Sequence, residues 1–234
     1  LKKFKEKIVP LQKPKPNNMN QNYRNLTKDE IQNLQSAGSN AANWADVLVA
    51  TDFNNYTISN VNFTGKVYLS SDITLVDVCD LGTSGKTSFA NGTEVGVLKE
   101  DGGLEVILHD NLTSMEAAFE VQEANTNPAL VKAMQQKALD YAKSIESDGS
   151  IIEEGAVVKH CLQLTDVHIG PKAHVIGATR LVDVSINSLP EAPSGVGTNV
   201  IMGHVIVGSD SHVTDAAQLD YCYVGQGCHI GRMY

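Results

Sequence analysis

The chain has 234 residues, of which 42% are hydrophobic and 19% charged, and its formal net charge is -9. This composition supports a buried core and excludes a wholly disordered or collagen-like chain. An acidic body repels phosphate backbones, so we expect no nucleic-acid partner. No apolar run reaches the roughly 20 residues that a membrane helix needs, so we expect no membrane partner.

The first 84 residues divide into three consecutive segments: a basic one, a helical one and one of β-type composition. Residues 1–22 are rich in lysine, proline and asparagine and predict a flexible basic arm. Residues 23–46 form a predicted helical N-terminal segment, because Thr27 and Glu30 make a capping box at a helix start. Residues 47–84 then turn to β-type composition.

A hairpin and two helices are predicted over residues 85–149. Two alternating apolar segments flank the glycine-containing turn Lys99–Gly103. Thr113 and Glu116 make a second capping box, and an Asn-Pro pair starts a helix expected over Ala129–Ser147.

From residue 151 the sequence repeats with a period of six, which neither an ordinary strand nor a helix predicts. The hexads over 151–186 read IIEEGA, VVKHCL, QLTDVH, IGPKAH, VIGATR and LVDVSI. Their first places, expected to point inward, are Ile151, Val157, Gln163, Ile169, Val175 and Leu181. The pattern returns after residues 187–199, and an earlier trace places Val61, Val67, Ile73 and Cys79 six apart.

These hexads resemble the hexapeptide-repeat superfamily, most closely in Ile169–His174 and Val224–His229. The resemblance implies a mainly β fold: a left-handed parallel β-helix with three hexads per coil, interrupted by the hairpin and the two helices. Its first coils would occupy residues 47–84, and its main part residues 150–234 with a loop at 187–199.

Further residues point to a more specific group. They are Tyr23–Thr27, Asn43–Asp46, the Lys99–Gly103 turn, Arg180-Leu181 and Ser185–Ser188. Together they are similar to a large uncharacterised bacterial domain-of-unknown-function family, over most of residues 23–234. Within that family the chain resembles an N-terminal portion.

The superfamily resemblance implies a transferase that acylates a hydroxyl of a sugar or sugar-nucleotide, with acyl-coenzyme A as a co-substrate, no bound cofactor and a homotrimeric assembly. A histidine would take the acceptor's proton, since neutral imidazole is available at pH 7. The candidates are His160, His168, His174, His204, His212 and His229. We rank His204 first because it follows the 187–199 loop, and loops that interrupt this β-helix often border the site. Asp210 could orient an imidazole. On regular coils His168, His174 and His229 should face solvent.

Two alternatives stay open. One is a non-catalytic β-helical scaffold or assembly module, which would lack convergent histidine and carboxylate groups. The other is the β-helical part of a sugar nucleotidyltransferase-related protein, whose catalytic loop is not encoded in residues 1–60. The segment Leu81–Ser88 ends like a phosphate-binding loop, but Asp80 occupies the required glycine position, so we interpret it as a turn.

The cysteines and histidines predict no metal site. None of the four cysteines forms a CxxC pair, and the spacing of His174 and His204 does not match the β-helical carbonic anhydrases. Packing explains all four thiols, because Cys161, Cys222 and Cys228 fall at fifth places and Cys79 at a first place. Without a secretion signal we expect a reducing, cytoplasmic location.

Overall fold

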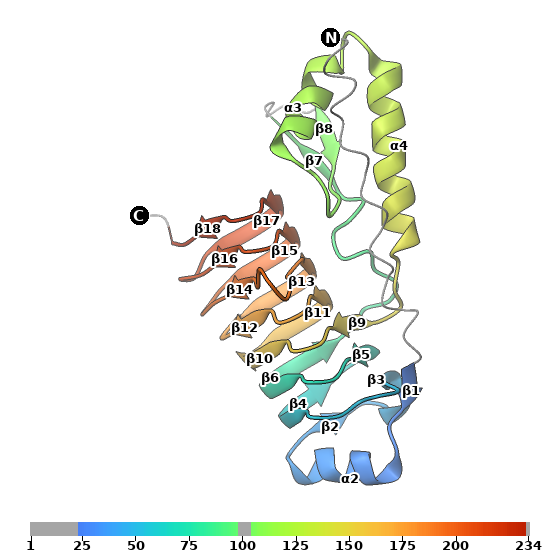
Figure 1. Ribbon diagram of the computed structural model, residues 1–234, viewed down its shortest axis with the longest axis vertical. Coiled ribbons are helices and arrows are strands. Elements are labelled where there is room, and N and C mark those ends of the chain that lie inside the picture. Colours follow the sequence, from blue (N-terminus) through green and yellow to red (C-terminus); the bar gives the residue numbers. More distant parts are fainter. Residues whose placement is uncertain (1–22, 98–103, 233–234) are drawn as a thin grey trace.

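The computed structural model describes residues 23–97 and 104–232 (Figure 1). The predicted basic arm and the predicted turn at 99–103 lie outside the described residues. The first elements are β1 (Tyr23–Asn25), α2 (Lys28–Ser36), β2 (Asn40–Ala41), the 3-10 turn η2 (Trp44–Asp46), β3 (Val47–Ala50), β4 (Thr57–Phe63), β5 (Val67–Leu69) and β6 (Thr74–Gly82).

An insertion then separates β6 from the remaining strands. It contains β7 (Glu94–Gly96), β8 (Glu105–Ile107), α3 (Ser114–Glu123) and α4 (Pro128–Ser144). The later strands are β9 (Ser150–Ile152), β10 (Val157–Cys161), β11 (Gln163–Ile169), β12 (His174–Ile176), β13 (Arg180–Ile186), β14 (Gly195–Val196), β15 (Ile201–Val207), β16 (His212–Val213), β17 (Gln218–Val224) and β18 (His229–Ile230).

The strands stack in parallel layers that rise from α2 to β18 (Figure 1). Thr57 pairs with Thr74, and each later layer repeats this offset, so the chain advances 17 residues per layer. Two of the later offsets are longer than 17 residues. The insertion lies between the paired strands β6 and β10, and a loop lies between the paired strands β13 and β15. The prediction of a mainly β fold is therefore confirmed, with most strand pairs parallel.

Residues with left-handed backbone angles turn the chain within each layer. Most of the non-glycine ones fall in three columns: Asn60, Asp77 and His160; Asp166, Asp183, His204 and Tyr221; and Asn55, Asp72, Lys172 and Asp210. Asn and Asp tolerate this conformation better than other non-glycine residues, which explains their frequency here. Most of these residues precede a buried one, as His204 precedes Val205.

The interior of the stack shows that a strict period of six is wrong. One series of fully buried aliphatic residues between positions 152 and 186 is Ile152, Val158, Leu164, Ile169, Val175, Leu181 and Ile186. Every third step along this series is five residues, which gives layers of 17 residues. Val157 and Gln163, predicted to point inward, are only partly buried, because the neighbouring Val158 and Leu164 take the interior positions.

The N-terminal predictions hold in part. Thr27 and Glu30 form the expected capping box of α2, and Val61, Val67 and Ile73 are buried. Cys79, expected at an inward position, is exposed. The interior position belongs to Val78 instead, which pairs with the buried Val61 of the previous layer and lies five residues, not six, after Ile73.

The insertion stands beside the β13–β17 end of the stack (Figure 1). Its strands β7 and β8 form the predicted antiparallel hairpin, and Thr113 caps α3 by accepting from the Glu116 backbone N–H. Asn127 precedes α4 but makes no side-chain cap bond, and the helix ends at Ser144 rather than Ser147. Leu108 and Leu112 of the insertion pack against Ile206 on the outer face of β15.

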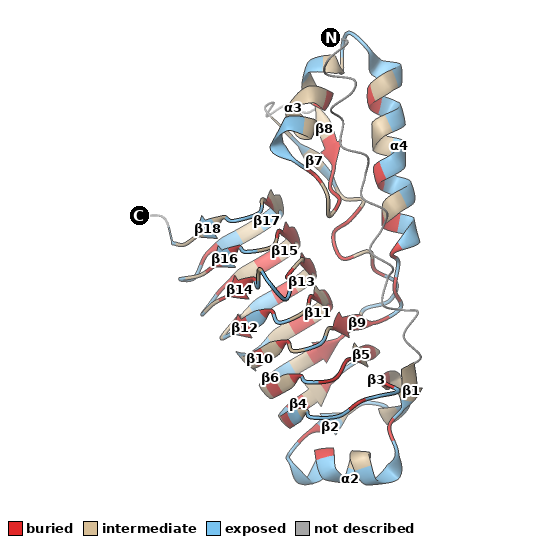
Figure 2. Cartoon of the chain, viewed as in Figure 1, coloured by how far each residue is buried: buried red, intermediate tan, exposed pale blue. Residues whose placement is uncertain are grey.

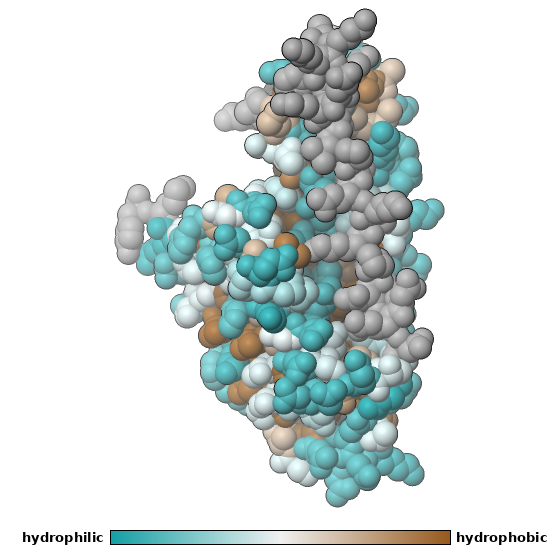
Figure 3. All heavy atoms as spheres, in the orientation of Figure 1, coloured by the Kyte–Doolittle hydropathy of each residue, from teal (hydrophilic) through white to brown (hydrophobic). Residues whose placement is uncertain are grey.

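Burial is concentrated in two places (Figure 2). The larger core runs through the interior of the stack, and a smaller one joins the insertion to β15 and β17. Among the coloured residues of the face in Figure 3, hydrophilic and near-neutral ones predominate, with small hydrophobic patches between them. In the part of the chain that the structure describes, no helix has the length and apolar character needed to cross a membrane.

Candidate functional site

Four side chains from successive layers form the candidate site. Parallel pairing of β11, β13, β15 and β17 places Asp166, Asp183, His204 and Tyr221 in one column, which we call the Asp183 column. All four have left-handed backbone angles. The repeat thus brings together residues that are 17 or 21 positions apart.

Asp183 orients the ring of His204. Nδ1 of His204 lies 2.9 Å from Oδ2 of Asp183. A carboxylate can only accept, so this contact selects the neutral tautomer that has its proton on Nδ1, in which Nε2 is the acceptor. The His204 side chain is 38% exposed, whereas Asp183 is 22% exposed. A solvent-accessible imidazole held by a more buried carboxylate is the arrangement of a general base.

The start of the insertion holds Asp183 in place. Oδ1 of Asp183 accepts hydrogen bonds from the Thr87 hydroxyl at 3.0 Å and from the Ala90 backbone N–H at 2.9 Å. One layer earlier, Asp166 accepts from the Thr83 hydroxyl at 2.6 Å. The segment Leu81–Ser88, which ends like a phosphate-binding loop, is therefore a turn that hydrogen-bonds to the carboxylates of the Asp183 column. It leads to β7 and not to a helix.

Tyr221 completes the column in a strained conformation. Its φ is 47°, a region that bulky residues rarely adopt. The residue is 49% exposed, and its ring centroid lies 4.5 Å from that of His204. The other columns also have left-handed backbone angles, so the conformation belongs to the turn, and it is the contact with His204 that makes Tyr221 part of the candidate site.

Two other histidine–carboxylate pairs are less suited to catalysis. His160 Nδ1 lies 3.0 Å from Asp77, but the side chains are 61% and 45% exposed, so water screens the pair. His168 Nε2 lies 2.6 Å from Glu153, and the imidazole is only 19% exposed. The Phe89 ring of the insertion lies 5.4 Å from His168, which is why this histidine does not face solvent as predicted.

Asp210 lies in a different column from His204 and is not the carboxylate that orients it. Its backbone N–H donates to the Ala192 carbonyl at 3.1 Å, within the predicted 187–199 loop. That loop also contains β14, which pairs with β12 and β16. Asp210 therefore borders the loop, whereas His204 borders the insertion.

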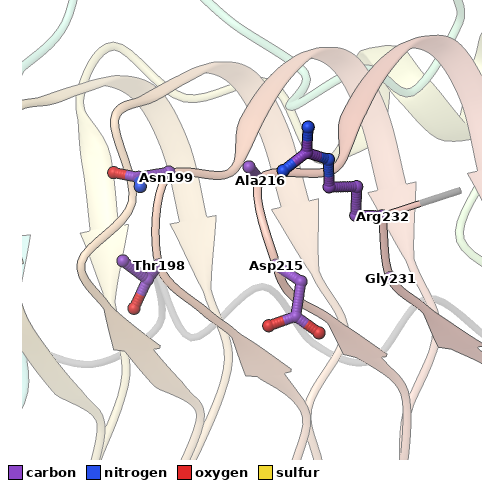
Figure 4. Close-up of a pocket in the computed structure, with 6 residues that line it drawn as sticks. All are labelled: Thr198, Asn199, Asp215, Ala216, Gly231 and Arg232. Carbon is purple, nitrogen blue, oxygen red and sulfur yellow. The ribbon is translucent and has the colours of Figure 1, made fainter. Parts of the chain in front are cut away.

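A shallow pocket of about 400 Å³ lies at another turn of the stack. Its lining residues are Thr198, Asn199, Asp215, Ala216, Gly231 and Arg232. Figure 4 shows the Asp215 carboxylate and the Arg232 guanidinium pointing in different directions. These side chains do not converge on a common point, which disfavours the pocket as a catalytic centre.

Asp110 joins the insertion to the stack. Its carboxylate accepts from the Tyr141 hydroxyl at 2.7 Å and from the Asn187 amide at 2.9 Å, and its carbonyl accepts from the Tyr223 hydroxyl at 3.4 Å. Burial, with the nearby Asp110 charge, raises the pKa of Tyr223 to about 12. It also raises the pKa of Tyr141. Both phenols therefore remain hydrogen-bond donors at neutral pH.

An Asp110→Ala variant should loosen the insertion without unfolding the stack. Hydrogen bonds to a charged group contribute roughly 1.5–3 kcal/mol, so amides of α4 should exchange with solvent about 10-fold faster or more. Hydrogen-exchange mass spectrometry measures this directly. Asp140→Ala, on the exposed side of α4, is the control and should leave the rates unchanged. Equal rates in wild type and Asp110→Ala would rule out this anchoring role.

A second polar cluster is buried within the insertion. His109 is 2% and Glu120 4% exposed, and Nδ1 of His109 and Oε2 of Glu120 have no bonding partner among the described residues. Burial raises the pKa of Glu120 to about 7, assisted by the Glu116 charge. Burial lowers the pKa of His109.

The described cysteines are all free thiols. Cys161 is buried, and this burial raises the pKa of its thiol. Cys222 and Cys228 are partly buried, so packing accounts for three of the four positions, with Cys79 the exception. Within residues 23–97 and 104–232, no group of three or more His, Cys, Asp or Glu side chains could hold a metal ion.

The comparisons identify the family. The model described as Domain of unknown function (DUF4954) matches residues 23–80 and 69–234. The chain belongs to this family. It is 22% identical over 245 residues to an "Uncharacterized protein" of Treponema pallidum (strain Nichols), covering 80% of this chain and 33% of that relative. The chain thus spans about a third of the length of that relative, and no solved structure matches it.

Sequence reasoning expected a domain-of-unknown-function family, and the DUF4954 match confirms that expectation. It did not find Asp183 or Tyr221. A repeat of 17 residues would have aligned Tyr221 with His204, whereas Asp183 lies 21 positions before His204 because the loop lengthens that layer. Sequence reasoning also left His109 out of the candidate histidines. The only available signal for His109 was its place in the apolar sequence around Leu108 and Leu112.

Proposed function

We propose that this DUF4954 chain is a transferase that acylates a hydroxyl of a sugar or sugar-nucleotide. In this proposal the stack is a left-handed parallel β-helix of the hexapeptide-repeat type, assembled as a homotrimer in the cytoplasm. The observation that carries the proposal is the Asp183–His204 pair at 2.9 Å. Its tautomer leaves Nε2 as a proton acceptor.

The reaction follows from that tautomer. Nε2 of His204 takes the proton of an acceptor hydroxyl as its oxygen attacks the carbonyl carbon of acyl-coenzyme A. A carbon–oxygen bond forms, the carbon–sulfur bond breaks, and the proton passes from His204 to the departing thiolate. Asp183 stabilises the intermediate imidazolium through Nδ1. The exposed ring of Tyr221 beside His204 offers the acceptor an apolar surface.

Acetyl-coenzyme A tests donor binding and transfer separately. At millimolar donor we expect a higher melting temperature, because a ligand that binds the native state stabilises it by mass action. With a panel of sugar and sugar-nucleotide acceptors, release of the coenzyme A thiol measures transfer. His204→Ala should lower kcat by roughly 10²–10⁴-fold, the contribution of a general base, and Asp183→Asn should lower it as well.

His160→Ala is the matched control, since His160 also has a left-handed backbone and a carboxylate partner. It should keep full activity. Equal losses in His160→Ala and His204→Ala would exclude a specific role for His204.

A non-catalytic scaffold is the second candidate, favoured by the diverging side chains of the pocket in Figure 4. No melting shift and no thiol release, from a chain that melts cooperatively, would support the scaffold. A β-helical part of a sugar nucleotidyltransferase-related protein is a further alternative, because the chain spans only part of its relative. In that case acetyl-coenzyme A would have no effect, and the longer protein would carry the activity.

A further inference from the structure

Three exposed histidines lie in one column on a face of the stack. Parallel pairing places His174 beside Gly195, Gly195 beside His212, and His212 beside His229. All three histidine side chains are exposed. We call this set the histidine column. It is separate from the Asp183 column and takes no part in the proposed transfer.

Within the histidine column, only His212 and His229 occupy adjacent layers. Their ring centroids are 6.1 Å apart and their planes differ by 40°. Gly195 makes room for the His212 ring, because a Cβ at residue 195 would lie 2.6 Å from Nδ1 of His212. His174 instead has Val157 and Gly195 as its neighbours in the column.

Two neighbouring imidazoles suit a late first-row divalent cation. Zinc–nitrogen bonds of about 2.0–2.1 Å place two ligating nitrogens roughly 3–4 Å apart. The two exposed side chains have to rotate about their side-chain torsions to bring two ring nitrogens to that separation, since the ring centroids are 6.1 Å apart. Imidazole favours Zn²⁺, Cu²⁺ and Ni²⁺. Unlike His160, His168 and His204, neither ring is bonded to a carboxylate among the described residues.

We propose that His212 and His229 form a two-histidine surface site for a divalent cation such as Ni²⁺ or Zn²⁺, with water filling the other coordination positions. Two protein ligands make a weaker site than the four of structural zinc. The site consists of groups from adjacent layers, so it exists only when the stack is folded.

Isothermal titration of the full chain with NiCl₂ tests the proposal. A Cys79→Ser background removes the exposed thiol as a competing ligand. We expect one site of micromolar affinity that weakens at least 10-fold in His212→Ala and equally in His229→Ala. His174→Ala, from the same column, should bind within two-fold of the parent.

Circular dichroism verifies that each variant folds, and His212→Gln and His229→Gln replace an alanine variant that does not. The proposal fails if either variant of the pair binds Ni²⁺ as tightly as the parent. It also fails if His174→Ala weakens binding as much as they do, or if the parent shows only millimolar binding.

Discussion

Val158→Asp is expected to prevent stable folding, whereas Val157→Asp is expected to fold. Val158 is fully buried inside the stack, and its neighbours one layer before and after are Leu75 and Val175. A carboxylate at position 158 has no cation to pair with in this apolar interior. Burying an unpaired charge costs several kcal/mol, about 4 or more, which is a large fraction of the stability of an ordinary domain.

Val157 is the matched control because it has the same side chain and the adjacent position but faces outward, partly exposed. Its replacement by Asp should change the free energy of unfolding by about 1 kcal/mol or less. Urea unfolding followed by circular dichroism compares the two variants. A stable Val158→Asp beside an unfolded Val157→Asp would support the strict six-residue frame and contradict the layers described above.

Glu120→Gln is expected to stabilise the insertion at pH 8 by up to about 3 kcal/mol. The pKa of Glu120 is about 7, raised from an ordinary 4.5 by burial and by Glu116. The folded state therefore binds this proton more tightly than the unfolded state. The stabilisation that this bound proton gives the folded state is complete below pH 4.5 and is lost as the pH rises through about 7. A glutamine does not titrate, so it removes this loss.

Hydrogen exchange of α3 amides between pH 5 and 8.5, corrected for intrinsic rates, measures the effect. Protection in the wild type should fall at the alkaline end, and in Glu120→Gln it should not. His109 acts in the opposite sense, since burial lowers its pKa and its protonation destabilises the fold as the pH falls below 6.5. Glu123→Gln, on the same helix, should keep the wild-type pH dependence. Parallel curves for wild type and Glu120→Gln would refute the assignment.

The sequence by itself determined the features that depend on neighbouring residues. Thr27 and Thr113 cap their helices because a cap needs only residues within one turn. The period of the aliphatic repeat fits no ordinary strand or helix, and the resemblance to hexapeptide repeats implied parallel β layers. The hairpin followed from alternation and a glycine-containing turn.

The tertiary structure alone decided the length of the layers and the partners of the polar groups. The buried residues Leu164 and Ile169 are five positions apart instead of six, so the inward position before them is Val158 and not Val157. Only the packing of side chains across layers determines this spacing. His204 meets Asp183 because stacking joins residues 21 positions apart. Glu120 is buried because α3 packs inside the insertion, a contact that no local pattern encodes. Local rules determine turns and caps, whereas contacts between distant segments determine which carboxylate faces which histidine.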